Sequence, residues 1–436
     1  MTAPNLVCGY VNITFSEVRQ CLLATLLIWL AQMPVAFALD SKSIFQLNKD
    51  RVFQIRVLNR ETERKSSIGS GFIVGDGFHM ITNFHVIGKI IQEPDLFYIS
   101  YLGSNGNEGE LKLIALDVAH DLALLQAETN LGEPTQSAAL PPRGAPVFAM
   151  GNPLDLGLNI AVGTNGGILN QTDDSRILFS GSLNPGMSGG PTFNDRGEVI
   201  GINVATARND ISFVVPARFL NKLIEDQDRS PLDSEDQLRA EVTRQLIAYE
   251  DGYIEKVLAE DWTRLQFRKL KLPGIISPTV RCWDNSEKLN DNALYKRFRI
   301  RCENKNNVYL DDTNQFVGDL SYEYYWLESE QLGSIRFKNL YEKLNKDQIG
   351  TRLDEEVVSN FNCDTWFVDI SGQEFKANMC RREYVKYKGL SDVLFTAAMI
   401  GHKSEGFFFT FIMTGVNYQS TLPLIEKMLE QIEWNP

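Results

Sequence analysis

Residues 184–191 read Asn-Pro-Gly-Met-Ser-Gly-Gly-Pro, and the serine of this stretch, Ser188, is a candidate nucleophile. Glycines on both sides of a serine let the backbone turn sharply and let another molecule approach it closely. The amides of Gly186 and Ser188 can then point at one oxygen atom, which is the arrangement of an oxyanion hole. A glycine-rich hairpin turn is the alternative interpretation of the same stretch, so further residues have to support the chemistry.

A serine hydroxyl needs a base and an orienting carboxylate to become a good nucleophile. The chain has four histidines, and His85 is the one at which an apolar strand ends in a short helical turn. Asp121, just before an aliphatic stretch, is the candidate carboxylate. Asp117 is set further back in the preceding turn, where it would more readily cap the turn or face solvent. The sequence therefore predicts that His85, Asp121 and Ser188 act together.

Short strands separated by glycine, asparagine and proline turns run from about residue 41 to residue 215. β-Branched and aliphatic residues dominate, and long helical periodicity is absent, so a sandwich or barrels are expected. The pattern predicts a closing helix over 217–225. It predicts strands that include Val52–Val57, Gly71–Val74, Met80–Thr82, Leu111–Ala115, Leu122–Gln126, Val147–Met150, Ile177–Ser180, Val199–Val204 and Ser212–Val215.

The order histidine, aspartate, serine resembles the trypsin-like fold and, more narrowly, the HtrA/Deg family of exported proteases. The resemblance rests on the strings TNFHV, DLALL and GMSGGP and on AMGNP at 149–153, and it covers about residues 44–226. It implies two six-stranded β-barrels with a catalytic triad between them. It also implies a serine endopeptidase that acts on polypeptides, with protein quality control as one role. A non-catalytic binding protein on a protease-like scaffold is the alternative.

The residue before the serine departs from the resemblance. HtrA-like proteins usually have asparagine there and digestive trypsins have aspartate, but this chain has Met187. Without an acid at that position, a new N-terminal ammonium group cannot be paired there. We therefore expect no activation by N-terminal cleavage, and we expect changes in residues 39–43 to leave activity intact. No PDZ domain is recognisable in the C-terminal half.

Four residues are candidates for the specificity pocket. In trypsin-like folds the residue six positions before the nucleophile lies at the base of this pocket, and here it is Ser182, followed by apolar Leu183. Val204 and Ala205, on a later strand, are expected to form a wall. Since no buried carboxylate is available for lysine or arginine, we expect small or medium aliphatic side chains at the cleaved position.

The N-terminus has the pattern of a secretory signal peptide over 1–38. Arg19 precedes an apolar run, Cys21–Leu30, and Ala36-Phe37-Ala38 supplies small residues for cleavage after Ala38. A membrane anchor over 21–39 is the alternative. The expected location of the mature protein is the periplasm or the outside of the cell.

The remaining chain is expected to form an acidic linker over 227–237 and a separate α+β domain over 238–436. A capping box of Ser234 and Gln237 predicts a long helix that ends near Leu258. Weak similarity between the two halves of the domain suggests a duplication, with chance similarity as the alternative. The overall fold class is therefore mainly β, with a double-barrel protease domain in front of an α+β domain.

The four cysteines of the C-terminal half are expected to form two disulfides in an oxidising compartment. Because each duplicated half would carry its own bridge, sequential pairing is favoured, and a zinc site is the less favoured alternative. These cysteines are Cys282, Cys302, Cys363 and Cys380.

The formal net charge of −13 argues against nucleic acid and anionic membranes as partners. The sequence suggests no metal site and no cofactor. A stable membrane association is expected only if the signal remains uncleaved, and a homo-oligomer is left open.

Overall fold

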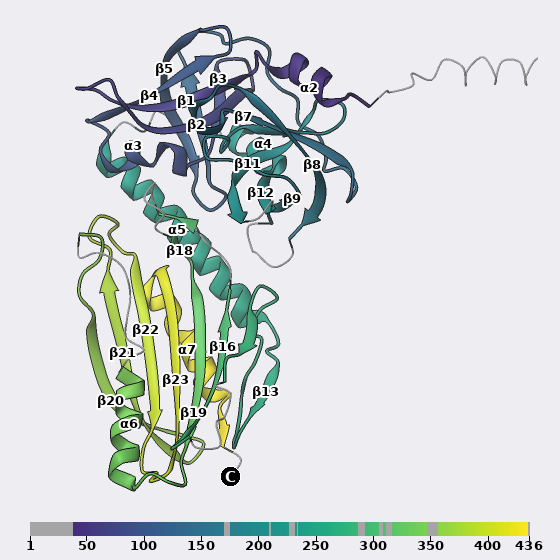
Figure 1. Cartoon of the computed structure of the whole chain (residues 1–436). Coiled ribbons are helices and arrows are strands. Elements are labelled where there is room, and N and C mark those ends of the chain that lie inside the picture. Colours follow the sequence, from purple (N-terminus) through teal and green to yellow (C-terminus); the bar gives the residue numbers. More distant parts are fainter. Residues whose placement is uncertain are drawn as a thin grey trace, which may run out of the picture. The chain divides into compact units, whose positions relative to one another are not determined.

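The computed structural model in Figure 1 describes residues 38–169, 175–208, 211–225, 232, 234–286, 293–304, 308–310, 316–346 and 356–434. The expected signal peptide, apart from Ala38, lies outside the described residues, as does most of the expected linker. Met1–Leu39 forms a unit of its own, and the description below concerns the second unit, Asp40–Pro436. No helix in the described ranges combines the length and the apolar character needed to cross a bilayer.

Six antiparallel strands form a first closed barrel in the order β1-β2-β3-β6-β5-β4. Side chains alternate between the core and the solvent along the strands of this barrel. On β5, Leu111 and Leu113 are buried in the core, while Lys112 between them is exposed. The strands are β1 (Val52–Asn59), β2 (Lys65–Val74), β3 (His79–Thr82), β4 (Phe97–Gly103), β5 (Glu108–Asp117) and β6 (Leu122–Ala127).

A second closed barrel has the order β10-β11-β12-β9-β8-β7. Its core holds Val147, Phe179, Ile200 and Val214. The two six-stranded barrels that the resemblance implied are thus confirmed. The strands are β7 (Pro146–Gly151), β8 (Asn159–Ile168), β9 (Ile177–Phe179), β10 (Pro191–Phe193), β11 (Val199–Arg208) and β12 (Ile211–Pro216).

Short helices surround the barrels. Helix α2 (Ser41–Asn48) is capped by Asp40, whose Oδ1 accepts a hydrogen bond from Ser43 N at 2.8 Å. A 3₁₀ turn, η1 (His85–Ile87), follows β3 and leads into α3 (Gly88–Gln92), while η2 (Pro153–Asp155) follows β7. Helix α4 (Ala217–Glu225) closes the second barrel, as predicted.

Helix α5 (Glu235–Ala259) begins after Ser234, whose hydroxyl accepts a hydrogen bond from Gln237 N at 3.3 Å, as the capping box predicts. Its first half buries Leu238, Val242 and Leu246 in the core cluster of the first barrel. Its second half buries residues 253, 254 and 257 in the core cluster of the C-terminal sheet. One helix therefore belongs to two hydrophobic cores.

The C-terminal part contains a seven-stranded sheet in the order β15-β16-β19-β23-β22-β21-β20. Its strands are β15 (Arg281–Asp284), β16 (Lys296–Glu303), β19 (Leu320–Glu328), β20 (Asn362–Ile370), β21 (Gln373–Glu383), β22 (Ser391–Met399) and β23 (Glu405–Val416). Smaller sheets join β13 (Arg264–Phe267), β14 (Leu270–Pro273) and β24 (Glu433–Trp434), and β17 (Val308–Tyr309) with β18 (Phe316–Val317).

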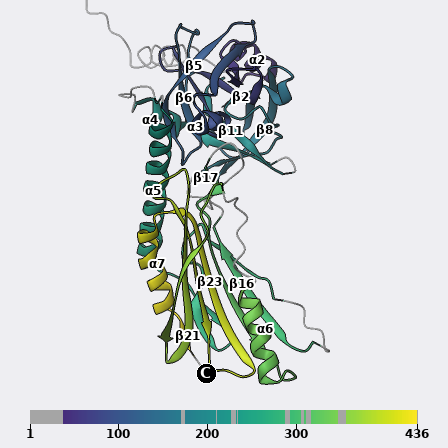
Figure 2. The same ribbon diagram turned by 90° about the vertical axis from the view of Figure 1, so that its left-hand side faces the viewer.

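Helices cover both faces of this sheet, with α5 and α7 (Tyr418–Glu430) on one and α6 (Ser334–Lys346) on the other (Figure 2). Successive side chains of β19 point to opposite faces of the sheet, and both faces need to be covered. Tyr324 and Trp326 enter the cluster that contains residues of α5 and α7, whereas Tyr325 and Leu327 pack with residues of α6. The aromatic run of this strand is therefore core on both sides.

Two disulfides join directly opposed cysteines of neighbouring strands. Cys282 is bonded to Cys302 across β15 and β16, and Cys363 to Cys380 across β20 and β21. This is the sequential pairing that the sequence favoured. The two bridges lie at opposite edges of the seven-stranded sheet. The duplication itself stays a prediction.

Candidate active site

His85 and Asp121 are bonded to each other in the first barrel. Nδ1 of His85 lies 2.8 Å from Oδ2 of Asp121, and the backbone N–H of His85 donates to Oδ1 at 3.0 Å. Because an ionised carboxylate can only accept, Nδ1 carries the hydrogen in the neutral imidazole. The other ring nitrogen, Nε2, is then free to accept a proton. The side chain of Asp121 is 2% exposed and that of His85 is 17% exposed.

The backbone around Asp121 is unusual for a residue with a side chain. Its φ is 58°, in the left-handed region, and its N–H donates to Val118 O at 3.2 Å. Its own carbonyl accepts from Asn83 Nδ2 at 2.8 Å and from Phe84 N at 3.2 Å. The residues just before His85 therefore hold the backbone of Asp121 as well as its side chain.

Asp117, the competing carboxylate, has a different partner. It accepts from the backbone N–H of His120 at 3.1 Å and lies 2.8 Å from Nδ1 of the same residue. The His120 ring stacks on Phe219 with a centroid distance of 3.6 Å. His79, the remaining histidine of the barrels, lies 2.9 Å from Asp76. Among these pairs, the His85–Asp121 pair is the one that the sequence predicted.

Ser188 lies in the turn between β9 and β10 and is 7% exposed. Its carbonyl accepts a hydrogen bond from Ser70 N, on β2, at 2.7 Å. The Ser70 hydroxyl donates to Gly186 O at 2.7 Å and accepts from Asn152 N at 2.8 Å. The fully buried Ser70 thus ties the serine turn of the second barrel to a strand of the first.

Two glycines permit this close contact. A Cβ atom at Gly186, where φ is +94°, would lie 2.4 Å from Asn152 O. A Cβ atom at Gly189, where φ is +86°, would lie 2.2 Å from Ser70 O and 2.3 Å from the Thr82 hydroxyl oxygen. All three distances are shorter than real Cβ contacts, so the turn requires glycine at these positions.

The elements that carry His85 and Ser188 meet at Gly69. A Cβ atom there would lie 2.6 Å from Val86 Cγ1 and 3.1 Å from Ser188 O. The residue after the histidine and the backbone of the serine therefore flank one glycine. No hydrogen bond between the Ser188 hydroxyl and His85 is present among the described residues, so the structure brings two members of the predicted triad into contact and the third into their neighbourhood.

The serine turn has two amides without a partner in the described part of the chain. The N–H groups of Met187, Gly189 and Gly190 donate to backbone carbonyls at 3.0 to 3.1 Å, whereas those of Gly186 and Ser188 donate to none. These are the two donors that the sequence assigned to an oxyanion hole. Met187 itself is 2% exposed and packs in the core of the second barrel.

The predicted pocket residues differ in exposure. Ser182 is exposed, whereas Leu183 and Val204 are 2% and 1% exposed. The N–H of Leu183 donates to the Ser212 hydroxyl at 3.1 Å, and that hydroxyl donates to Gly181 O at 2.8 Å. Ala205 belongs to β11, but its side chain lies outside the described residues. These contacts fix the backbone beside Ser182.

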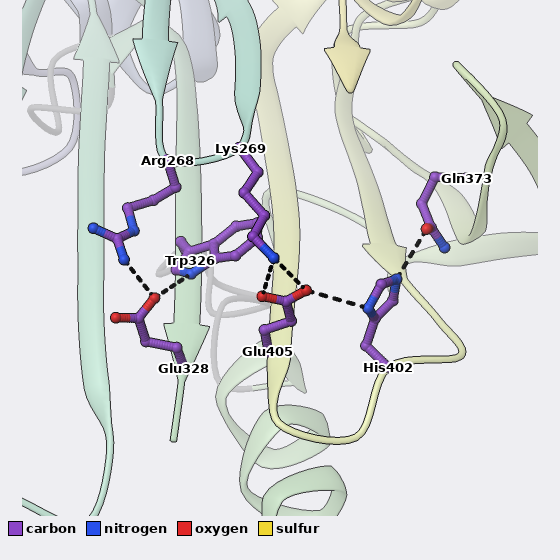
Figure 3. A network of polar contacts seen from close by, with 7 residues as sticks. All are labelled: Arg268, Lys269, Trp326, Glu328, Gln373, His402 and Glu405. Carbon is purple, nitrogen blue, oxygen red and sulfur yellow. Dashed lines mark hydrogen bonds and ion pairs between the residues drawn. The ribbon is translucent and has the colours of Figure 1, made fainter. Parts of the chain in front are cut away.

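The fourth histidine, His402, belongs to a polar network in the C-terminal part (Figure 3). Its Nε2 lies 2.9 Å from Gln373 Oε1, and its Nδ1 lies 3.5 Å from Glu405, which pairs with Lys269 at 2.9 Å. A second ion pair, between Arg268 and Glu328, stands beside it at 2.6 Å. The network connects the β13–β14 hairpin to the main sheet. Within the described residues, no three histidine, cysteine, aspartate or glutamate side chains are arranged to hold a metal ion.

Two further residues approach the histidine–aspartate pair from the C-terminal part, and the sequence analysis did not find them. Tyr309 stacks on the ring of His85, and Gln245 contacts the turn before Asp121. No local pattern marks either residue. Ser70 was also missed, although its position between Gly69 and Gly71 could have drawn attention to it.

Comparison with known proteins gives matches over the barrels. The family of trypsin-like peptidase domains matches residues 69–202, which include His85, Asp121 and Ser188. Serine protease HTRA3 of Homo sapiens is 32% identical over 180 residues, which are 38% of this chain and 40% of that protein. An Ectopseudomonas mendocina protein named "Probable periplasmic serine endoprotease DegP-like" is 36% identical over 144 residues, 31% of this chain and 29% of that protein.

One solved structure also matches part of the chain. The crystal structure of the serine endoprotease from Yersinia pestis has 28% sequence identity and a TM-score of 0.38, and the match covers 43% of this chain and 66% of that chain. The match to this chain covers about two-fifths or less of the length of each of the two curated relatives named in the previous paragraph.

Proposed function

Because this chain contains a trypsin-like peptidase domain whose relatives are HtrA/DegP-like serine proteases, we propose that it is an exported serine endopeptidase. The observation that carries the proposal is the 2.8 Å hydrogen bond between His85 Nδ1 and Asp121 Oδ2. It leaves Nε2 as the basic nitrogen of the neutral ring. The alternative, a binding protein on a protease-like scaffold, has no evident need for this bond or for two serine-turn amides that lack a partner among the described residues.

In the proposed reaction the Ser188 hydroxyl attacks the carbonyl carbon of a peptide bond while His85 Nε2 takes its proton. Asp121 stabilises the imidazolium that forms. The amides of Gly186 and Ser188 donate to the oxygen that becomes negative, a contribution worth about 10² to 10³ in rate per donor. His85 then gives its proton to the leaving amine. In the second stage water attacks the acyl carbon while His85 takes a proton from it, and the bond to Ser188 Oγ breaks as His85 returns that proton to the serine.

Small or medium aliphatic side chains are the proposed specificity at the cleaved position. Ser182 carries no charge that could pair with lysine or arginine, and its neighbours Leu183 and Val204 are apolar. A peptide library would test this, and a preference for arginine or lysine would contradict it. Polypeptides are the proposed substrates, and quality control is the proposed role.

Export is supported by two observations. The two disulfides fit an oxidising compartment. Relatives such as the Ectopseudomonas mendocina protein are named periplasmic. Whether residues 1–38 are removed as a signal peptide or anchor the chain stays a prediction, and so does a homo-oligomer.

Covalent labelling tests the catalytic proposal. A fluorophosphonate probe should modify wild-type protein and fail to modify Ser188→Ala. Ser66→Ala is the matched control, because Ser66 is exposed on β2 and has no proposed role in the site. It should be labelled at the wild-type rate. A folded wild-type protein that neither reacts with the probe nor cleaves unfolded substrates such as casein would favour the binding protein instead.

A further inference from the structure

Gln245, on α5, bonds to the chain segment that leads to Asp121. Its Oε1 accepts from Val118 N at 2.8 Å, and its Nε2 donates to Leu116 O at 2.8 Å. Nε2 also donates to Glu241 Oε1 on the same helix at 2.8 Å. Leu116 and Val118 are 2% and 0% exposed, so water is poorly placed to replace the glutamine. One side chain thus satisfies two buried backbone groups at the end of β5.

The same segment carries the strained backbone of Asp121. The N–H of Val118 donates to Gln245 Oε1, and the Val118 carbonyl accepts the hydrogen bond from Asp121 N at 3.2 Å. Asp121 has a φ of 58°, a conformation that a residue with a side chain keeps only when its surroundings enforce it. Gln245 therefore supports the turn that presents the Asp121 carboxylate to His85.

Tyr309, on β17, contacts the other member of the pair. The rings of Tyr309 and His85 stack at a centroid distance of 4.6 Å and an angle of 30°. Phe316 packs on Tyr309 from β18 at 4.8 Å, and Tyr309 is 9% exposed. Burial and the negative charge of Asp121 raise the pKa of Tyr309 to about 12. The tyrosine is therefore packed beside the pair and is not a surface side chain.

The stacked Tyr309 ring supports the His85 ring without blocking its nitrogen atoms. Both nitrogens of an imidazole lie in the plane of the ring, and a stacked ring covers its face. Nε2 of His85 makes no hydrogen bond within the described residues, and neither does the Tyr309 hydroxyl. The contact thus restrains the ring while leaving free the atom that has to accept a proton.

We propose that Gln245 and Tyr309 are positioning residues of the catalytic pair, supplied by the part of the chain that follows the two barrels. Gln245 acts through the turn that holds Asp121, and Tyr309 acts through the ring of His85. The inference rests on the proposed serine endopeptidase activity. It assigns residues 238–436 a share in building the active site, beyond a role in binding.

Kinetics of full-length variants give the first test. Gln245→Ala and Tyr309→Ala should each lower kcat about 10- to 100-fold, since a misplacement near 1 Å costs on that order, with KM little changed. Tyr309→Phe keeps the ring and should keep the wild-type kcat. Glu255→Ala is the matched control on α5, because this glutamate is exposed and lies further along the same helix, away from Gln245. It should also keep the wild-type kcat.

A second readout does not depend on turnover. In protein labelled with ¹⁵N-histidine, the proton between His85 Nδ1 and Asp121 should give a sharp low-field NMR signal. Gln245→Ala and Tyr309→Ala should broaden it through faster exchange with water, and Glu255→Ala should not. If Gln245→Ala fails to fold, Gln245→Glu replaces it, because glutamate accepts from Val118 N but cannot donate to Leu116 O.

The outcomes separate the two proposals. An unchanged signal in both variants overturns the positioning role, whatever happens to kcat. A rise of kcat in Tyr309→Ala also overturns it, because the tyrosine would then obstruct the site. Absence of Ser188 labelling in the wild type contradicts the proposed activity, and the NMR comparison still decides whether Gln245 and Tyr309 fix the pair.

Discussion

Removing the Ser70 hydroxyl tests the connection between the serine turn and the first barrel. In Ser70→Ala the carbonyl of Gly186 loses its donor at 2.7 Å, and the N–H of Asn152 loses its acceptor at 2.8 Å. Both residues are buried, and Ser70 is 0% exposed, so water has little access to either group. The change in volume is small, and unpaired polar groups dominate the effect.

The magnitude follows from these two groups. A buried donor or acceptor left without a partner costs about 1–3 kcal/mol, so the loss of both partners should lower the free energy of unfolding by about 2–6 kcal/mol. Because Gly186 also supplies one amide of the proposed oxyanion hole, a shift of its backbone should lower kcat by up to about 10²-fold. Stability and rate should therefore fall together.

Urea unfolding followed by circular dichroism measures the first effect, and peptide hydrolysis measures the second. Ser66→Ala, an exposed serine on the same strand, is the control and should match the wild type in both assays. A Ser70→Ala protein whose unfolding free energy lies within about 0.5 kcal/mol of the wild type, with unchanged kcat, would refute the reasoning.

Asp121→Asn should lower kcat by about 10⁴-fold without unfolding the protein, because asparagine no longer selects the tautomer of His85. Asp117→Asn should leave kcat unchanged, and equal effects of the two changes would contradict the role proposed for Asp121. Partial desolvation and the charge of a nearby glutamate raise the pKa of Asp319 to about 6. Ionisation of Asp319 therefore lowers the free energy of unfolding as pH rises from about 4 to about 6. Urea titrations of Asp319→Asn should not show this decrease. Replacing Cys363 and Cys380 by serine should lower the unfolding free energy by about 3 kcal/mol, and an unchanged urea midpoint would count against it.

Local sequence patterns were sufficient for most of the barrels and for the histidine–aspartate pair. The strands named from the sequence lie within strands of the structure, to within a residue at their ends. Three strands of the two barrels were not named, β4, β8 and β10. β8 is rich in glycine and asparagine and largely exposed, and β10 has only three residues and begins with proline, so neither has a strong alternation of apolar side chains.

Helix ends were less predictable than helix existence. No local pattern indicated the start of α7 (Tyr418–Glu430), where Asn417 caps the helix by accepting from Gln419 N at 3.0 Å. Helix α2 was not expected at all. An eight-residue helix carries little periodicity, and its formation depends on the Asp40 cap and on burial of Ile44.

The rest of the site depends on contacts between residues that are distant in sequence. The partnership of Tyr309 with His85 and of Gln245 with Val118 follows from the way the C-terminal part packs on the first barrel. A tyrosine in a short strand and a glutamine on an amphipathic helix are ordinary in their own surroundings. Only the assembled cores make them neighbours of the pair.

Gly189 gives this architecture a practical consequence. The glycine belongs to the second barrel and touches Ser70 and Thr82 of the first, so no side chain would fit between the two barrels there. The proposed nucleophile, Ser188, and the proposed base, His85, lie on different barrels, so a slight separation of the barrels at Gly189 would stop the proposed catalysis before either barrel unfolds. The rate of peptide hydrolysis would then report separation of the two barrels more sensitively than a spectroscopic measurement of β-structure.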